Sequence, residues 1–87
     1  MYIIKYRKKC LKDIERLKSV GLADRAKKLI NIIENNPYQN PPPYEKLIGD
    51  LNGAYSRRIN IQHRLVYQIL EKEKIIKILS LWTHYEY

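Results

Sequence analysis

Four residues that lie far apart in this sequence of 87 residues are of the types that RNA cleavage requires: Glu45, Arg58, Arg64 and His84. A carboxylate can take the proton of a ribose 2′-hydroxyl, which then attacks the adjacent phosphorus. Arginine stabilises the charge that develops on the phosphorane, because its planar guanidinium binds two oxygens at once and stays charged. A histidine can protonate the leaving 5′-oxygen near neutral pH. The set predicts acid–base cleavage of RNA.

The two arginines can act together only if they share one face of a sheet. Arg57 and Arg58 lie in a stretch that reads as a strand, so their side chains are expected on opposite faces. We expect Arg58 to share a face with Arg64, because the apolar positions of the strand have the parity of Arg57. The alternative is a surface arginine paired with a carboxylate such as Asp50, and for either arginine alone this is the commoner outcome.

The two histidines differ in their sequence surroundings. His63 begins a strand beside Arg64, which favours a structural residue that hydrogen-bonds a loop. His84 lies in the polar and aromatic segment 82–87, where a core histidine is not expected. A role in chemistry and a disordered terminus are equally compatible with that position. Tyr44, Tyr55 and Tyr85 are candidates for stacking on RNA bases, and half-buried packing explains each of them equally well.

No metal or cofactor is expected. Two histidines and one cysteine without close spacing do not make a zinc site, and no phosphate-binding loop or nucleophile motif is present. Cys10 has helical spacing to Ile14 and Leu17, so it reads as a core residue. A single thiol fits the cytoplasm better than secretion. No apolar run approaches the ~18 residues of a membrane span, and the first residues are too short for a signal peptide.

The elements that must position these residues follow the order βααβββ. Apolar periodicity predicts helices over about 7–20 and 22–35, and strands over 2–6, 54–59, 63–70 and 75–82. The predicted fold is a single α+β domain, residues 1–87, with an antiparallel helix hairpin on one face of a mostly antiparallel sheet. The proline-rich stretch 37–43 is expected to be a stiff loop that holds Glu45.

The first helix is predicted to bury one stripe of residues, namely Cys10, Leu11, Ile14 and Leu17. Its opposite face is predicted to meet water with Lys8, Lys9, Lys12, Asp13, Glu15 and Arg16.

The net charge points to a polyanionic partner. Seventeen Lys and Arg against nine Asp and Glu give a formal charge of +8 and a pI near 9.7. Such an excess attracts nucleic acid, because each neutralised phosphate releases counterions. An anionic membrane surface, an acidic protein or a merely solvated basic surface are the alternatives. The same charge favours an acidic, partly disordered protein partner that would cover the arginines.

Three stretches together resemble the YoeB/Txe toxins of the RelE-like superfamily. They are the segment 51–60 (LNGAYSRRIN) followed by 63–67 (HRLVY), the segment 43–47 (PYEKL), and the terminal pair His84-Tyr85. The resemblance implies a RelE-type fold and cleavage of messenger RNA in the ribosomal A site. It also implies neutralisation by a cognate acidic antitoxin of the YefM/Axe type, and leaves a homodimer open. The alternative function is a non-catalytic basic module that binds RNA or DNA.

The resemblance also implies roles for individual residues. Glu45 takes the position of the general base, Arg64 that of the phosphate-stabilising arginine, and His84 that of the general acid. Arg58 corresponds to a supporting basic residue, and Tyr85 to the terminal aromatic residue that contacts substrate.

The sequence departs from the family pattern at three places. Ile48 stands where family members often carry a lysine near the phosphate, so that charge is missing or is supplied by Lys46. The segment 81–83 (LWT) replaces the usual basic and aromatic residues before the histidine, and Glu86-Tyr87 extends the tail. Substrate binding is accordingly expected from Arg58, Tyr85, Lys46 and Tyr55.

Overall fold

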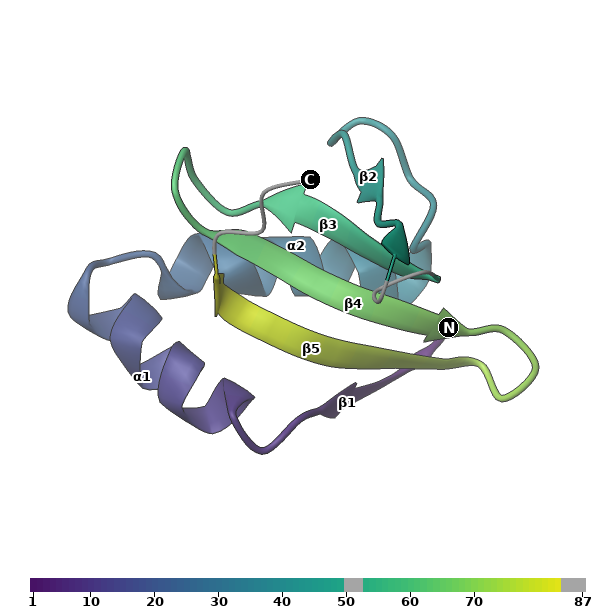
Figure 1. Ribbon diagram of the computed structural model, residues 1–87, viewed down its shortest axis with the longest axis horizontal. Coiled ribbons are helices and arrows are strands. Elements are labelled where there is room, and N and C mark those ends of the chain that lie inside the picture. Colours follow the sequence, from purple (N-terminus) through teal and green to yellow (C-terminus); the bar gives the residue numbers. More distant parts are fainter. Residues whose placement is uncertain (50–52, 84–87) are drawn as a thin grey trace.

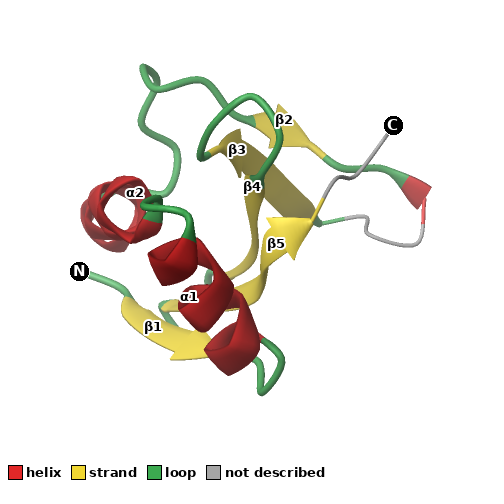
Figure 2. Cartoon of the chain, turned by 90° about the vertical axis from the view of Figure 1, so that its left-hand side faces the viewer, coloured by secondary structure: helices red, strands yellow, loops and turns green. Residues whose placement is uncertain are grey.

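The strands of the computed structural model form one sheet, and both helices lie against the same face of it (Figures 1 and 2). The structure describes residues 1–49 and 53–83. Along the chain the elements are β1 (Ile3–Tyr6), α1 (Cys10–Ser19), α2 (Ala23–Asn35), β2 (Glu45–Lys46), β3 (Ala54–Arg58), β4 (Arg64–Leu70) and β5 (Ile75–Thr83). The predicted α+β fold and its order of helices and long strands are confirmed.

The sheet has the strand order β1-β5-β4-β3-β2. β1 runs parallel to β5, and every other pair is antiparallel. The sequence did not predict β2, because a strand of two residues carries no measurable alternation. This short strand forms one edge of the sheet, and β1 forms the other (Figure 1).

The main core lies between the helices and the sheet. It contains Cys10 and Leu17 from α1, and apolar side chains of α2 and the central strands: Ala26, Leu29, Ile33, Ile59, Leu65, Tyr67, Ile76, Ile78 and Leu81. Alternation along β4 sends Leu65 and Tyr67 to this face, so Arg64 and Val66 point to the other one. A smaller apolar cluster forms on that other face from Leu47, Ala54, Val66 and Leu79.

Two residues of α1 differ from the prediction. Leu11 is 63% exposed, and Asp13 is buried. Asp13 Oδ2 accepts a hydrogen bond of 3.0 Å from the backbone N–H of Leu81. β1 pairs with β5 only as far as Ile78, so this part of β5 has no neighbouring strand on that side. The buried carboxylate therefore satisfies a backbone donor that a longer β1 would have satisfied.

The chain reverses direction between the helices at Gly21, whose φ of +74° suits glycine. The reversal agrees with the predicted hairpin. The helix axes are inclined to each other: in Figure 2, α2 is seen end-on, whereas α1 lies across the view. The inclination leaves a hollow between the helices. No helix within residues 1–49 and 53–83 is long and apolar enough to cross a membrane.

Candidate active site

Charged side chains gather on the sheet face that the helices leave uncovered. The strand register places Glu45 opposite Ser56, and Arg58 opposite Arg64. Side chains directly opposite each other in an antiparallel pair share a face, so these four belong to one face. Together with Pro43 and Tyr44, these four residues line a hollow of about 180 Å³. The expectation that Arg58, and not Arg57, shares a sheet face with Arg64 is confirmed.

The centre of this hollow is an ion pair. Arg64 Nη1 lies 3.6 Å from Glu45 Oε1, and the same nitrogen donates to Ser56 Oγ at 3.4 Å. The Arg64 side chain is 17% exposed, whereas that of Glu45 is 52% exposed. The guanidinium is thus held by the sheet, and the carboxylate remains open to solvent. A phosphate that entered the hollow would compete with the carboxylate for the guanidinium and leave a proton acceptor beside it.

Ser56 is a member of the site that the sequence did not reveal. Its side chain is fully buried, and its hydroxyl orients Arg64. No feature of its sequence position distinguishes it from a structural serine. The signal would have been its register opposite Glu45, and this depends on the undetected strand β2.

Two of the expected substrate-binding residues lie on the opposite face. Lys46 pairs with Tyr55, so both have the parity opposite to Glu45 and Ser56. Tyr55 packs against the main core and stacks on Tyr67 with ring centroids 5.8 Å apart. The structure therefore does not bring Lys46 or Tyr55 to the hollow that holds the ion pair.

Tyr44 is the tyrosine that does reach the hollow. Its ring also makes an edge contact with Tyr55, at 5.5 Å between centroids. The guanidinium of Arg57 lies 4.9 Å from the centroid of the Tyr44 ring. Of the two uses considered for this residue, half-buried packing is thus observed, and its side chain still forms part of the wall.

His63 has the structural surroundings that were expected. It is buried, and its ring stacks on Trp82 at 4.1 Å between centroids. Its backbone N–H donates to Asn60 Oδ1 at 2.7 Å, which fixes the turn between β3 and β4. The guanidinium of Arg16 lies 5.9 Å from the Trp82 ring, so α1 also contacts the end of β5.

The expected general acid His84 and its neighbour Tyr85 lie outside the described residues, as do Asp50, Glu86 and Tyr87. The nearest described position is Thr83, whose Cα is the register partner of Arg64. The last described residue of β5 thus lies beside the arginine of the ion pair.

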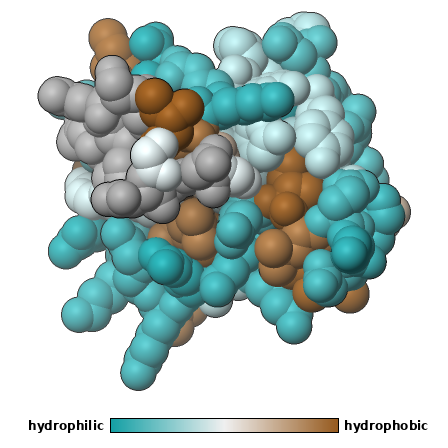
Figure 3. Space-filling view, turned by 45° about the vertical axis from the view of Figure 1, so that its right-hand side comes forward, coloured by the Kyte–Doolittle hydropathy of each residue, from teal (hydrophilic) through white to brown (hydrophobic). Residues whose placement is uncertain are grey.

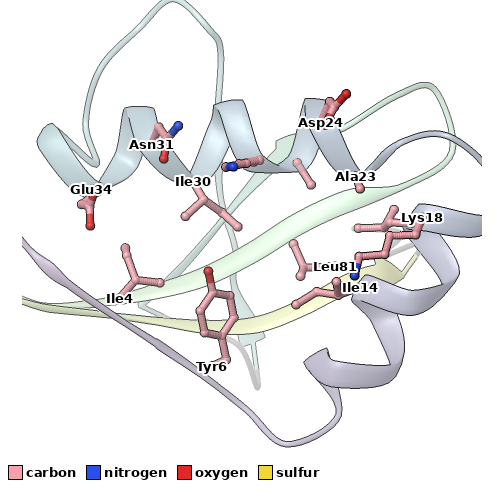
Figure 4. A pocket seen from close by; sticks show the side chains of 13 residues that line it. Ile4, Tyr6, Ile14, Lys18, Ala23, Asp24, Ile30, Asn31, Glu34 and Leu81 are labelled. Atoms are coloured by element: carbon pink, nitrogen blue, oxygen red, sulfur yellow. The ribbon is translucent and has the colours of Figure 1, made fainter.

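A larger hollow, about 530 Å³, lies between the inclined helices and the edge of the sheet (Figure 4). Ile4, Tyr6, Ile14, Ile30 and Leu81 form its apolar part, and Lys18, Asp24 and Glu34 stand at its rim (Figure 4). It is on the helical side of the sheet, away from the ion pair. Within residues 1–49 and 53–83, no three His, Cys, Asp or Glu side chains cluster closely enough to hold a metal ion.

The surface seen in Figure 3 is largely hydrophilic, and its apolar side chains form small separate patches. Exposed lysines and arginines continue over the turn before α1 and over both helices: Lys8, Lys9, Lys12, Arg16, Lys18, Arg25, Lys27 and Lys28. The positive charge of the chain is therefore spread over the helical side as well as the ion-pair side.

Comparison with known proteins gives one consistent result. The family model described as YoeB-like toxin of bacterial type II toxin–antitoxin systems matches residues 4–85. Toxin YoeB of Synechocystis sp. is 38% identical over 65 residues, which cover 75% of this chain and 73% of that protein. The YoeB–YefM complex from Staphylococcus aureus contains a chain with a TM-score of 0.80 and 31% identity, with 98% of this chain and 99% of that one covered. The YoeB dimer from S. aureus has a TM-score of 0.79 and 30% identity, with coverage of 97% and 98%.

Proposed function

Because the chain belongs to the YoeB-like toxins of bacterial type II toxin–antitoxin systems, we propose that it is an endoribonuclease that cleaves messenger RNA in the ribosomal A site. The observation that carries the proposal is the ion pair of Glu45 and Arg64 in an open hollow, with Arg58 directly opposite Arg64. This arrangement places a proton acceptor beside the guanidinium of Arg64 and in the same hollow as Arg58. A module that only binds nucleic acid gains nothing from an anion at its phosphate contact.

In the proposed reaction, Glu45 takes the proton of the 2′-hydroxyl. The 2′-oxygen attacks phosphorus, and Arg64 and Arg58 stabilise the negative charge that develops on the non-bridging oxygens. The bond from phosphorus to the 5′-oxygen then breaks, and His84 gives that oxygen a proton. The products are a 2′,3′-cyclic phosphate and a free 5′-hydroxyl. In the sequence His84 directly follows Thr83, the partner of Arg64.

The ribosome completes the site in this proposal. A hollow of about 180 Å³ is smaller than the pockets of ~300–1,000 Å³ that usually enclose a ligand, so it cannot hold an RNA segment by itself. Positioning of the two reacting groups can account for ~7–11 kcal/mol of a barrier. We propose that messenger RNA held in the A site is presented to the hollow in this way, and that the toxin acts in the cytoplasm, where ribosomes translate.

The proposed partners follow from the relatives and from charge. The structures of S. aureus YoeB include a complex with YefM and a dimer. We propose that a cognate acidic antitoxin of the YefM type binds this chain, whose formal charge is +8, and blocks the arginines. A homodimer is compatible with the same relatives.

The decisive experiment compares messenger RNA alone with messenger RNA on programmed ribosomes, with primer extension to map the cut. We expect cutting with ribosomes only, and its loss in Glu45→Gln with ribosome binding retained. Glu73→Gln, which changes an exposed carboxylate in the β4–β5 turn, is the matched control and should cut normally. Equal cutting of free RNA would rule out ribosome dependence. Full cutting by Glu45→Gln would rule out Glu45 as the general base, and a wild type that binds ribosomes without cutting would favour the non-catalytic binding module.

A further inference from the structure

Arg57 is the largest of the fully buried side chains, and it carries a charge that the proposed reaction does not use. Its residue is 1% exposed. No carboxylate of the described residues forms an ion pair with it. A buried guanidinium needs hydrogen-bond acceptors to offset its loss of water. The identity of those acceptors therefore shows what this side chain holds.

All of its acceptors belong to, or touch, the loop between α2 and β2. Arg57 Nη2 donates to the carbonyl of Pro37 at 3.0 Å, and Nη1 donates to the carbonyl of Pro42. Nε donates to Tyr67 Oη at 2.9 Å, and Tyr67 Oη donates in turn to the same Pro37 carbonyl at 3.1 Å. The Tyr44 ring covers the guanidinium. The side chain of Arg57 is thus hydrogen-bonded to both the beginning and the end of the loop.

The loop needs such an outside anchor. It contains four prolines, which have no N–H groups, so it cannot order itself with a ladder of backbone bonds. The strand that follows it, β2, has only two residues, of which Glu45 is the first. Pro42 lies three positions before Glu45, and Tyr44 directly precedes it. The position of the carboxylate is therefore set by how firmly the loop is fastened.

The guanidinium of Arg57 and the ion pair of Glu45 and Arg64 lie on opposite faces of the sheet, with β3 between β2 and β4. In β3, Ser56 and Arg58 point to the open hollow, and Arg57 points to the loop. The strand that supports Arg64 through Ser56 thus also carries the anchor of the loop that presents Glu45. Three consecutive residues of β3, 56–58, therefore connect the support of Arg64 with the anchor of the loop that carries Glu45.

We propose that Arg57 is a positioning residue, which fastens the proline-rich loop so that Glu45 stays beside Arg64. The catalytic consequence rests on the proposed function, whereas the ordering of the loop does not. Lysine in this place keeps one charge but cannot span two carbonyls and a hydroxyl at once. Arg57→Lys should therefore release the loop from these hydrogen bonds, although the substitution retains the buried positive charge. Tyr67→Phe removes one hydroxyl from the network and is the milder change.

The first test is hydrogen exchange of the backbone amides, which needs no activity. Arg57→Lys should raise the exchange rates of Tyr44–Leu47 selectively, and Tyr67→Phe should do so to a smaller degree. Lys28→Arg, an exposed change on α2, should leave the rates unchanged. If Arg57→Lys does not fold, Tyr67→Phe decides alone. Wild-type exchange rates at Tyr44–Leu47 in a folded variant would overturn the proposal.

The second test is a double-mutant cycle on single-turnover cleavage with saturating ribosomes. Misplacement of a reacting group costs on the order of 100-fold, so we expect a loss of this size in Arg57→Lys. In a Glu45→Gln background the same change should cost less than about threefold, because the group that it positions is already gone. Equal losses in both backgrounds would overturn positioning through Glu45. If the wild type itself does not cleave, the proposed function fails, and hydrogen exchange still decides the role of Arg57.

Discussion

Arg58 and Arg64 face each other across β3 and β4, but they differ in what holds them. Arg64 is largely buried and is oriented by Glu45 and Ser56. Arg58 is exposed. A charge that is fixed before the substrate arrives stabilises a transition state more than one that must be ordered during the reaction. Arg64 is therefore the stronger candidate for the developing charge, and Arg58 for substrate capture.

A lysine at each position should separate these roles. We expect Arg64→Lys to lower the single-turnover cleavage rate by about 100- to 1,000-fold, because a point charge cannot replace the oriented fork. Arg58→Lys should mainly raise the ribosome concentration required for half-maximal rate. Rates measured over a range of ribosome concentrations separate the two effects. Equal rate losses in both variants would refute this division.

The departure at Ile48 also makes a prediction at this scale. Ile48 is 79% exposed and lies two positions after β2. A lysine there would supply the charge that the resemblance to the family leads one to expect near the phosphate. Because an exposed charge is screened by solvent, we expect Ile48→Lys to raise cleavage only about two- to fivefold. Ile3→Lys adds the same charge on the opposite edge strand and is the control. An equal gain in both variants would show that net charge, and not position, is responsible.

At the scale of elements, the predicted parts and the missed parts have different physical origins. The strands β3, β4 and β5 were predictable, because each has at least five residues, enough for the alternation of side chains between the two faces to be followed in the sequence. The same alternation correctly separated Arg57 from Arg58. The structure does not bring Lys46 or Tyr55 to the hollow: the face of Lys46 is set by the two-residue strand β2, whereas Tyr55 has the parity of Arg57 in β3, which the alternation could have shown. Short-range patterns cannot report a pairing between segments that are distant in the sequence.

Asp13 was assigned to the solvent face for a related reason. Its spacing from Cys10 and Leu17 places it on the buried stripe, but its charge favours water, and its partner, the N–H of Leu81, is 68 residues away. Only the short length of β1 leaves that donor without a strand partner. The helix sequence thus accounts for the position of this carboxylate, and the assembled sheet supplies the donor that makes its burial possible.

Removal of this contact should weaken the attachment of α1 to β5. We expect Asp13→Ala to lower the free energy of unfolding by about 1–3 kcal/mol, because a buried N–H loses its acceptor. Asp13→Asn keeps an acceptor oxygen and should lose less. Urea unfolding of the two variants measures the difference. A loss no greater in Asp13→Ala than in Asp13→Asn would contradict the proposed role of the acceptor.

A cluster of hydrogen-bonded residues at the surface joins the residue before β1, the loop after α2 and the turn between β4 and β5. Glu71 accepts hydrogen bonds from Lys74 at 2.7 Å, from Tyr2 at 2.9 Å and from Tyr38 at 3.0 Å. The bond from Lys74, followed by those from the two tyrosines, lowers the pKa of the Glu71 carboxyl below its ordinary 4.5. Loss of water and the bond to Glu71 raise the pKa of Tyr38 to about 12.

The lowered pKa predicts a dependence on acid. A group with a depressed pKa in the folded state stabilises the fold above its unfolded pKa, and this contribution is lost as the pH falls through the folded value. The wild type should therefore have a higher thermal midpoint than Glu71→Gln at neutral pH. The difference should shrink as the pH drops below about 4.5. Circular dichroism melts over this range measure it, and a difference that does not change with pH would contradict the assignment.

At the scale of the whole molecule, the positive charge lies on two sides of one sheet. The arginines of the candidate site occupy the open face, and exposed lysines lie on the helices. Both helices lie on the other side of the sheet (Figure 2). A long polyanion that reaches both sides would have to bend around the sheet edge. In the proposed function, the RNA of the ribosome would contact both sides at once. The distribution therefore fits a large folded RNA partner better than a short free strand.

This distribution predicts how salt should affect ribosome binding. Each phosphate contact contributes about 0.7–0.9 to the slope of log affinity against log salt. We expect the affinity of the protein for ribosomes to fall steeply with monovalent salt. The double variant Lys12→Gln/Lys28→Gln should reduce this slope. The cleavage rate of its bound complexes should stay unchanged. Lys72→Gln in the β4–β5 turn removes one charge away from both helices and should leave the slope as it is. Because net charge alone would make every lysine equivalent, an equal slope change per charge in all variants would show that the helical face does not dock on ribosomal RNA.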